Sequence, residues 1–503
     1  MFRTAELGQK VSKAEFNQAV PDLRIALIEA QQEIRKAGVP VIIVFAGVDG
    51  AGKGESANLL QEWMDPRWIV TRAYEDPSEE EGERPELWRY WRDLPREGQV
   101  GIFLSAWYSR PYLDRVYGKI SRSEFDEALD RILQFERMLA NDGALILKFW
   151  MHLGKKAQEK RFKKLEKDLL QAWRVTKKDW KHWKLYDKFI DAAEHTIMKT
   201  SIGRAPWTIV EGADARFRGL KVGQTVLEGI RRRIGEVEAE TAAPSDSENS
   251  YALSTGGSED SIGSASVLSA LDMTKALPKD EYRNELDKYQ AMVNLLSREA
   301  RERKISTILV FEGWDAGGKG GNIRRITAAL DARDYQVIPI AAPTDEELSH
   351  HYLWRFWRHL PRGGRFTFFD RSWYGRVLVE RIEGFATEKT WRRAYGEINN
   401  FESHLVDHGD VLLKFWLHVT KEEQAARFKA REEISFKRWK LTEEDWRNRE
   451  KWDEYEIAVN DMVAQTSTRA APWVLVEGNN KRFARIKVLK TICRRLHERL
   501  SDD

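Results

Sequence analysis

One stretch in the second half of the chain constrains the fold more than any other. Apolar residues that favour β-structure, 305–311, lead directly into the glycine-rich segment 313–321, and a helical pattern follows at 322–330. Strand, glycine loop with a lysine, and helix, in this order, form the context in which Gly-x4-Gly-Lys is a phosphate-binding loop. Its backbone N–H groups and the helix dipole attract phosphate oxygens. The predicted phosphate-binding residues are Gly313, Ala316, Gly317, Gly318, Lys319, Gly320 and Gly321.

The loop departs from the usual pattern at one position. The residue after the lysine is commonly Ser or Thr, whose hydroxyl holds Mg²⁺, but here it is Gly320. The metal then needs another oxygen ligand, and Asp315, inside the loop, is the candidate.

The chain contains this pattern twice. Gly47 begins a second loop 266 positions before Gly313, and the same offset relates Trp107 to Trp373 and Glu211 to Glu477. A gapless register over such a length indicates a duplicated domain rather than a short repeat. We expect two domains, residues 1–235 and 267–503. The small, polar and acidic residues of 236–266 predict a flexible linker between them.

The second copy alternates short apolar runs with helical patterns. The predicted strands are residues 305–311, 336–341, 365–369, 411–419 and 473–477. The predicted helices are residues 348–360, 387–408, 420–433 and 442–465, and Thr420 with Glu423 forms a candidate capping box. This alternation predicts an α/β fold with a parallel five-stranded sheet covered on both faces. Ligands of such sheets bind at the carboxyl ends of strands.

A second motif, residues 368–376, places Asp370 at the end of a predicted strand. An aspartate there often only caps the next turn. Following the loop lysine by 51 residues, with Arg371 and Arg376 beside it, it is better interpreted as a Mg²⁺-side carboxylate. The two arginines can neutralise charge on a phosphoryl group during transfer.

A basic segment with interleaved aromatic residues follows at 426–440. Arg427 and Arg431 are four residues apart and share one helix face, and Lys437 lies further along. A solvated basic face is the plainer interpretation. Above a phosphate-binding loop, a polyanion held between the two is the better one, and it predicts strong salt dependence.

These segments resemble the polyphosphate kinase 2 family over essentially all of each copy, and the tandem arrangement resembles its two-domain branch, the polyphosphate:AMP phosphotransferases. The resemblance implies a three-layer P-loop kinase-like fold with a helical lid, duplicated in tandem. It implies catalytic roles for Asp315, Lys319, Asp370, Arg371 and Arg431. It implies Mg²⁺, with Mn²⁺ as the alternative, on Asp315 and Asp370. The further phosphate contacts expected are Arg376, Arg427 and Lys437.

The expected reaction is transfer of a terminal phosphoryl group from inorganic polyphosphate to AMP, giving ADP. ADP as acceptor, an ATP-dependent small-molecule kinase and a polyphosphate-binding scaffold remain as alternatives. The net charge of +3, the absence of a long apolar segment and the single cysteine, Cys493, lead us to expect a cytoplasmic protein with no nucleic-acid or membrane partner. We also expect a homo-oligomer.

The first copy lacks part of this chemistry. Asp49 and Lys53 match the loop of the second copy, but Glu55 stands where the second copy has Gly321. The counterparts of Asp370, Arg371 and Arg431 are Leu104, Ser105 and Leu165. Losing a metal ligand and charge-stabilising groups costs orders of magnitude in rate, so we expect a catalytically inactive copy. The tryptophans at helical spacing recur in both copies, which favours core packing over base stacking; they are Trp88, Trp91, Trp354 and Trp357.

Overall fold

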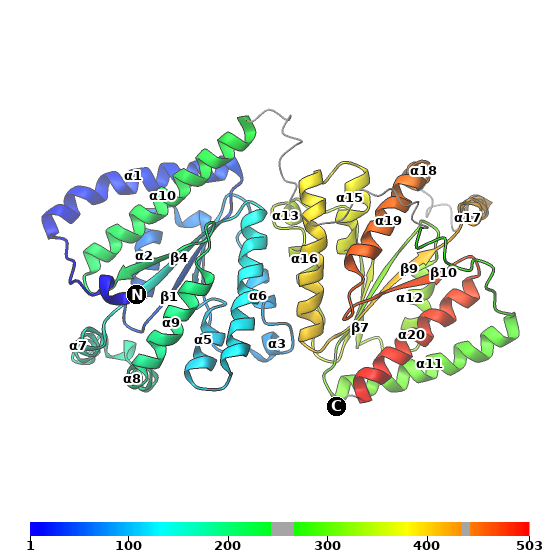
Figure 1. The fold of residues 1–503 in the computed structure, drawn as a ribbon, viewed down its shortest axis with the longest axis horizontal. Coiled ribbons are helices and arrows are strands. Elements are labelled where there is room, and N and C mark those ends of the chain that lie inside the picture. Colours follow the sequence, from blue (N-terminus) through cyan, green and yellow to red (C-terminus); the bar gives the residue numbers. More distant parts are fainter. Residues whose placement is uncertain (243–265, 434–442, 502–503) are drawn as a thin grey trace. The chain divides into compact units, whose positions relative to one another are not determined.

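The computed structural model describes residues 1–242, 266–433 and 443–501. The chain divides into two compact units, the first containing strands β1–β5 and the second β6–β10 (Figure 1). Each unit thus holds the sheet of one copy of the repeat. Lys437 lies outside the described residues, so its predicted phosphate contact stays a prediction.

Each unit is built on a parallel five-stranded sheet, as expected. In the second unit the strands are β6 (Thr307–Gly313), β7 (Tyr335–Pro339), β8 (Phe366–Asp370), β9 (Val411–His418) and β10 (Trp473–Glu477), in the order β10-β9-β6-β8-β7. In the first unit they are β1 (Val41–Gly47), β2 (Ile69–Ala73), β3 (Val100–Leu104), β4 (Leu145–His152) and β5 (Trp207–Glu211), in the order β2-β3-β1-β4-β5. In both units the strand before the phosphate loop is central.

Helices cover both faces of each sheet. Those of the first copy of the repeat are α1 (Lys13–Ala37), α2 (Lys53–Trp63), α3 (Glu79–Gly82), α4 (Trp88–Arg92), α5 (Ser109–Val116), α6 (Arg122–Asn141), α7 (Lys155–Glu166), α8 (Lys177–Lys184), α9 (Tyr186–Thr200) and α10 (Ala215–Ala242). Those that follow are α11 (Lys279–Glu302), α12 (Lys319–Thr327), α13 (Asp345–Leu348), α14 (Trp354–Trp357), α15 (Val379–Ile382), α16 (Glu388–Asp407), α17 (Lys421–Glu433), α18 (Glu443–Glu450), α19 (Trp452–Thr466) and α20 (Lys481–Ser501). Short 3-10 turns are η1 (Phe2–Ala5), η2 (Pro66–Trp68), η3 (Ala172–Arg174) and η4 (Trp373–Val377).

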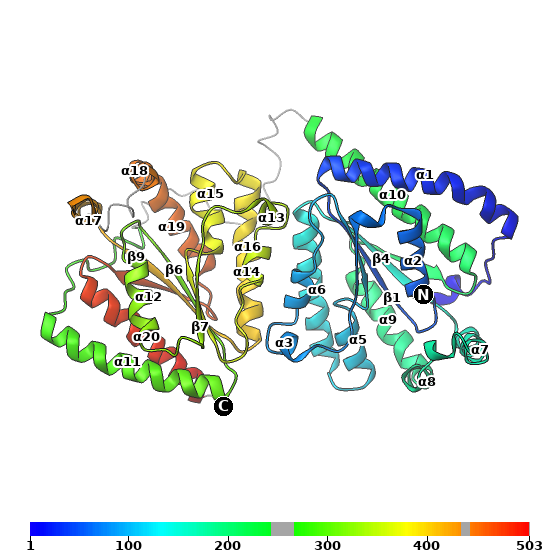
Figure 2. The same cartoon turned by 180° about the vertical axis from the view of Figure 1, so that it is seen from behind.

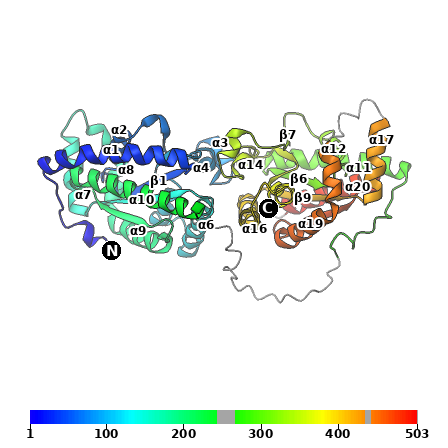
Figure 3. The same cartoon turned by 90° about the horizontal axis from the view of Figure 1, so that it is seen from above.

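The central strands are buried along almost their whole length because helices pack on both of their faces. In the second unit α11 and α20 lie side by side on one face of the sheet (Figure 2), and Leu309 and Phe311 of β6 share a core with Val488 and Leu496 of α20. In the first unit α1 and α10 form the corresponding pair (Figure 3). The repeated tryptophans are buried, as predicted; they are Trp88, Trp91, Trp354 and Trp357.

Each unit also contains a fully enclosed charged cluster. In the second unit the Lys414 Nζ donates hydrogen bonds to Glu402 Oε2 (2.7 Å), to the hydroxyl of Tyr374 (2.9 Å) and to the carbonyl of Thr466 (2.8 Å). The first unit repeats the arrangement with Lys148, Glu136, Tyr108 and Thr200. A buried ammonium with every proton bonded costs far less than an unpaired one.

Apart from shifts of one to three residues at the ends of elements, the structure differs from the predicted elements in three places. The predicted helix 348–360 is interrupted between α13 and α14, where Ser349, His350 and His351 have low helix propensity. The predicted helix 442–465 is divided into α18 and α19. Residues 236–242, assigned to the linker, continue α10 because their glutamate and alanine side chains favour a helix.

Among the described residues, no helix combines the length and the hydropathy that a membrane span requires.

Candidate active site

The phosphate loop of the second unit has the geometry that its glycines predict. Gly313 ends β6 with φ of 140°, and a Cβ there would lie 2.4 Å from the carbonyl oxygen of Leu417. Only glycine fits this position. Helix α12 begins at Lys319, whose Nζ donates hydrogen bonds to the carbonyls of Gly313 (2.8 Å) and Trp314 (3.4 Å). The ammonium therefore lies within the loop, at the positive end of the helix.

Asp315 is held on both carboxylate oxygens. Its Oδ1 accepts a hydrogen bond from Arg371 Nη2 and its Oδ2 from Asn448 Nδ2, each at 2.9 Å. Burial by itself would raise the pKa of Asp315, but the positive charges of Lys319 and Arg371 and the Asn448 amide together lower it below its ordinary value. Asp315 is therefore ionised at neutral pH. The structure brings three predicted site residues, Asp315, Lys319 and Arg371, into one place.

Asp370 ends β8, the neighbour of the central strand β6. Its Oδ2 lies 4.0 Å from the position that a Cβ on Gly320 would take, so the carboxylate points at the first turn of α12. The next residue, Arg371, has φ of 66°, which is unusual for a residue with a side chain. Its counterpart Ser105 has φ of 54°, so the bend belongs to the fold. The second unit uses it to aim an arginine at Asp315.

The sequence interpretation missed Glu312. This residue is 5% exposed, next to the loop, and its Oε1 accepts a hydrogen bond from Ser372 Oγ at 2.8 Å. Burial raises its pKa, more than the charges of Lys319 and Arg371 lower it. The signal was present in the repeat: the first copy has alanine at both counterpart positions, Ala46 and Ala106.

Asn448 was missed as well. It lies on α18 and reaches Asp315 across the site. In the first unit the counterpart is His182, whose Nδ1 lies 2.6 Å from Asp49 Oδ2. Both units therefore hold the loop aspartate from the same helix, but only the second does so with a neutral amide.

Arg427, predicted to bind phosphate, is instead occupied by the protein. Its Nε donates to Glu423 Oε1 (2.6 Å). The two terminal nitrogens donate to four carbonyls, those of Ala316 (2.8 Å), Gly317 (3.3 Å), Gly478 (2.6 Å) and Asn479 (3.0 Å). A guanidinium has five N–H donors, and all five are used. The structure thus favours a positioning role: Arg427 fastens α17 to the phosphate loop.

The predicted capping box at the start of α17 is half formed. The Glu423 N–H donates to Thr420 Oγ1 (3.3 Å), but the Glu423 carboxylate binds Arg427 rather than returning to Thr420. The N–H of Thr420 donates to Asn479 Oδ1 instead (3.0 Å). The capping box therefore lacks the hydrogen bond from the Thr420 N–H to the Glu423 carboxylate, because that carboxylate accepts from Arg427 instead.

The other two predicted arginines differ in position. Arg431, on α17, is close enough to Asp315 for its charge to contribute to lowering the pKa of that carboxyl. Arg376 pairs with Glu380 (Nε to Oε2, 3.2 Å) and lies over the ring of Tyr352. Its predicted phosphate contact remains a prediction.

A cavity of about 60 Å³ opens beside Asp315. Its lining combines apolar and aromatic side chains with the charged groups of the loop: Glu312, Gly313, Trp314, Asp315, Arg371, Gly375, Leu378, Val379, Trp416, Gln424, Asn448 and Tyr455. Trp314 is fixed by a parallel stack on Trp452, with ring centroids 3.7 Å apart. The arrangement suits a ligand with one flat apolar part and one anionic part.

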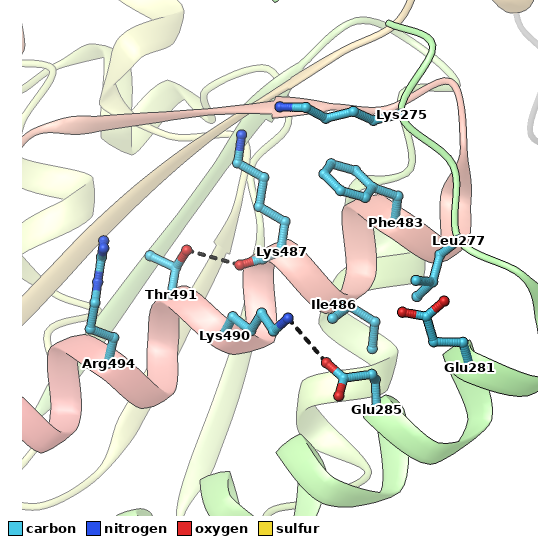
Figure 4. A pocket seen from close by; sticks show the side chains of 10 residues that line it. All are labelled: Lys275, Leu277, Glu281, Glu285, Phe483, Ile486, Lys487, Lys490, Thr491 and Arg494. Carbon is cyan, nitrogen blue, oxygen red and sulfur yellow. Dashed lines mark hydrogen bonds and ion pairs between the residues drawn. The ribbon is translucent and has the colours of Figure 1, made fainter. Parts of the chain in front are cut away.

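A larger cavity of about 360 Å³ lies between α20 and residues 275–285 (Figure 4). It is rich in lysine, but its cations have acidic partners. Lys490 pairs with Glu285 (3.1 Å), and Lys275 and Lys487 share Glu477 (3.0 and 2.6 Å). Because these charges are already neutralised, this cavity is a weaker candidate for an anionic ligand than the loop.

The carboxylates of the site suit magnesium. In the described part of the chain, no three His, Cys, Asp or Glu side chains gather as a metal site. Mg²⁺ commonly takes only one or two protein carboxylates and completes its shell with phosphate oxygens and water. Asp315, in the loop before α12, and Asp370, whose carboxylate points at its first turn, are two carboxylates that would meet that requirement.

The parallel sheet with its central loop strand, the glycine loop and its lysine, and the strand-end aspartate define a P-loop kinase. Comparison of the sequence with known protein families identifies the family within this class. The family model of Polyphosphate kinase 2 (PPK2) matches residues 10–237 and again 276–503. The chain belongs to the polyphosphate kinase 2 family.

Relatives match the chain along its whole length. A polyphosphate:AMP phosphotransferase of Pseudomonas aeruginosa is 51% identical over 493 residues, which cover 98% of each chain. One of Pseudomonas syringae pv. tomato is 46% identical over 504 residues, covering 100% of this chain and 99% of its own. The crystal structure of a Pseudomonas aeruginosa PA01 protein assigned as a polyphosphate kinase 2 matches with a TM-score of 0.88 and 47% identity over 100% of both chains.

Proposed function

We propose that the second unit transfers the terminal phosphoryl group of inorganic polyphosphate to AMP. A phosphate oxygen of AMP attacks the terminal phosphorus, and the bond from that phosphorus to the next bridging oxygen breaks. The products are ADP and a polyphosphate shorter by one phosphate. The observation that carries the proposal is the convergence of Lys319, Asp315, Asp370 and Arg371 on one phosphate loop, in a chain similar throughout to polyphosphate:AMP phosphotransferases.

The positively charged residues are proposed to bind the phosphate groups, and the carboxylates to hold the metal ion. Lys319 and the loop N–H groups hold the transferred phosphoryl, and Arg371 and Arg431 balance charge that develops on its oxygens. Asp370 and Asp315 would hold Mg²⁺, or Mn²⁺, which when bound neutralises phosphate oxygens. Such catalysis depends on positioning and electrostatics rather than on covalent chemistry.

Asp315 acts by orientation. The phosphate of AMP is already ionised at neutral pH, so it needs no base. An aspartate with a lowered pKa is also a poor base. Held by Arg371 and Asn448, its carboxylate has a fixed direction, which favours metal and substrate positioning over proton transfer.

We propose that the acceptor nucleoside binds over the cavity beside Asp315, whose volume of about 60 Å³ accommodates only part of it. Trp314, Leu378 and Tyr455 offer an apolar lining for a base, and Glu312 and Asn448 offer polar groups for recognition. In this arrangement the AMP phosphate would lie next to the loop. The basic segment of α17 then faces the donor.

The first unit is proposed to be inactive, because it has Leu104 and Ser105 where the second has Asp370 and Arg371. We also expect a cytoplasmic protein, consistent with a single cysteine that is buried as a free thiol. Self-association is expected too; light scattering during size-exclusion chromatography measures it.

One experiment separates the alternatives. Purified protein is incubated with AMP and Mg²⁺, with either polyphosphate or ATP as donor, and ADP and ATP are quantified by chromatography. Product from polyphosphate and AMP, lost on adding a chelator and restored by excess Mg²⁺, supports the proposal. Product with ATP alone would indicate an ordinary kinase, and turnover only when ADP replaces AMP would indicate a diphosphate acceptor. Binding of polyphosphate without any turnover would indicate a scaffold.

A further inference from the structure

The phosphate loop of the first unit contains a carboxylate of its own. Glu55 is the third residue of α2 and the counterpart of Gly321. Its Oε1 accepts hydrogen bonds from Arg161 Nη2 and Arg174 Nη2, both at 2.7 Å, and its Oε2 accepts one from Arg218 Nη2. Three arginines therefore converge on one anionic group at a helix N-terminus.

These arginines come from separate elements, α7, η3 and α10, and have no common local reason to meet. Burial by itself would raise the pKa of Glu55, but the arginines lower it, so the carboxylate is charged. Several guanidinium groups around an anion on a helix N-terminus form the arrangement by which proteins bind phosphate. The first unit thus has the arginines that would bind a phosphate group, and the Glu55 carboxylate is the anion that they bind.

The same contact fills the loop. A Cβ added at Gly52 would lie 2.3 Å from Cζ of Arg218, so the guanidinium packs directly on the loop backbone. At the counterpart Gly318 the nearest atom is Asn322 Nδ2, at 3.9 Å. The loop of the second unit is open where that of the first is closed.

The second unit also has an arginine near this position, Arg485, one residue beyond the counterpart of Arg218, and it lacks the carboxylate. Arg485 Nη2 lies 3.7 Å from the position that a Cβ on Gly321 would take. Within the described residues Arg485 forms no ion pair, and its one hydrogen bond runs to the hydroxyl of Tyr282 at 3.4 Å. An arginine next to the loop and without an acidic partner is available to an anion from outside.

We propose that the Glu55 carboxylate takes, in the first unit, the position that a phosphate group of the donor takes in the second, where Arg485 binds it. The first unit is then an anion site closed by its own side chain. Removing the glutamate charge opens a second polyphosphate-binding site. The part concerning Arg485 rests on the proposed donor; the part concerning Glu55 needs only binding.

Hydrogen exchange in the full chain tests the closed site. Wild type, Glu55→Gln and Glu55→Gly are compared with and without inorganic polyphosphate, with sodium phosphate at equal ionic strength as the control. In both variants we expect polyphosphate to slow exchange of residues 47–56 by about threefold or more, and in wild type to leave it unchanged. Equal behaviour of all three proteins in this segment would overturn the proposal.

The mirror experiment places the carboxylate in the second unit. A Cβ at Gly321 would meet Arg485 Nη2 at an ordinary contact distance of 3.7 Å, so Gly321→Glu and its uncharged match Gly321→Gln can be compared for KM. A charge-assisted contact with Arg485 should raise the KM for polyphosphate at least about tenfold in the glutamate variant over the glutamine variant, with similar KM values for AMP. Equal KM values for polyphosphate would contradict the inference.

The exchange experiment fails independently of the proposed function, whereas the Gly321 experiment requires turnover with polyphosphate. If wild type forms no ADP from polyphosphate, the proposed reaction is wrong, while the exchange result for Glu55 still decides whether the first unit is a closed anion site. If the Glu55 variants do not fold, the Gly321 pair decides the question, because it changes a position that no described side chain fills.

Discussion

Replacing Arg427 by lysine distinguishes a positioning arginine from a substrate-binding one. The side chain is 5% exposed, and its five N–H donors all bind protein acceptors. Lysine has three donors on one nitrogen, so at least two acceptors lose their partner. Each hydrogen bond from a charged group contributes about 1.5–3 kcal/mol. We therefore expect Arg427→Lys to lower the free energy of unfolding by about 3–5 kcal/mol.

Thermal unfolding measures the loss of stability, and steady-state kinetics measure the effect on kcat. A loss of this size should lower the Tm of the transition that includes the second unit by about 10 °C. It should lower kcat because the carbonyls of Ala316 and Gly317 are no longer held. The matched variant Arg161→Lys, in the first unit, changes a side chain whose hydrogen bond within the described residues runs to Glu55, and because lysine keeps the positive charge it should lower the Tm less.

The opposite result would refute the positioning role. If Arg427 bound the donor, Arg427→Lys would leave the Tm unchanged, raise the KM for polyphosphate and weaken its dependence on salt. That result would support the phosphate contact that the sequence predicts for Arg427.

Three further predictions concern the loop, its aspartate and the thiol. Lys319→Ala should reduce kcat at least a hundredfold, and Lys53→Ala should reduce it less than twofold, measured by ADP formation from polyphosphate; equal losses would mean that the first unit also catalyses. The lowered pKa of Asp315 contributes stability that is present above its ordinary value of 3.8 and is lost as the pH falls through the folded value. The stability difference between wild type and Asp315→Asn should therefore shrink on acidification, as followed by thermal unfolding from pH 7 to pH 3; a constant difference would contradict the pKa assignment. Burial raises the pKa of Cys493 to about 12, so a thiol reagent at pH 8 should label it only after unfolding, and rapid labelling of the native protein would count against its burial.

The repeat made most of the fold predictable. An apolar strand followed by a glycine loop has few structural solutions, and a second copy in the same register showed which features belong to the fold. The five strands of the second unit therefore lie within a few residues of their predicted positions. The interruption near His350 was not predicted, because apolar periodicity continues across it while helix propensity does not.

The site was predictable where a residue type has few roles and not where it has many. A lysine after a glycine loop and an aspartate at a strand end are recognisable from sequence, whereas an arginine on a lid helix can bind substrate or protein equally well. Only the geometry shows that the donors of Arg427 are used. Glu312 and Asn448 belong to no common motif, and only comparison of the two copies could have drawn attention to them.

The buried lysine–glutamate–tyrosine cluster is the same in both units, although the residues at their phosphate loops differ. Deleting either Lys148 or Glu136 alone would strand the other charge in a dry environment, at a cost of several kcal/mol. A single substitution at either position is therefore strongly destabilising. The same pair therefore stabilises the interior of both units, independently of the residues that differ at their two phosphate loops.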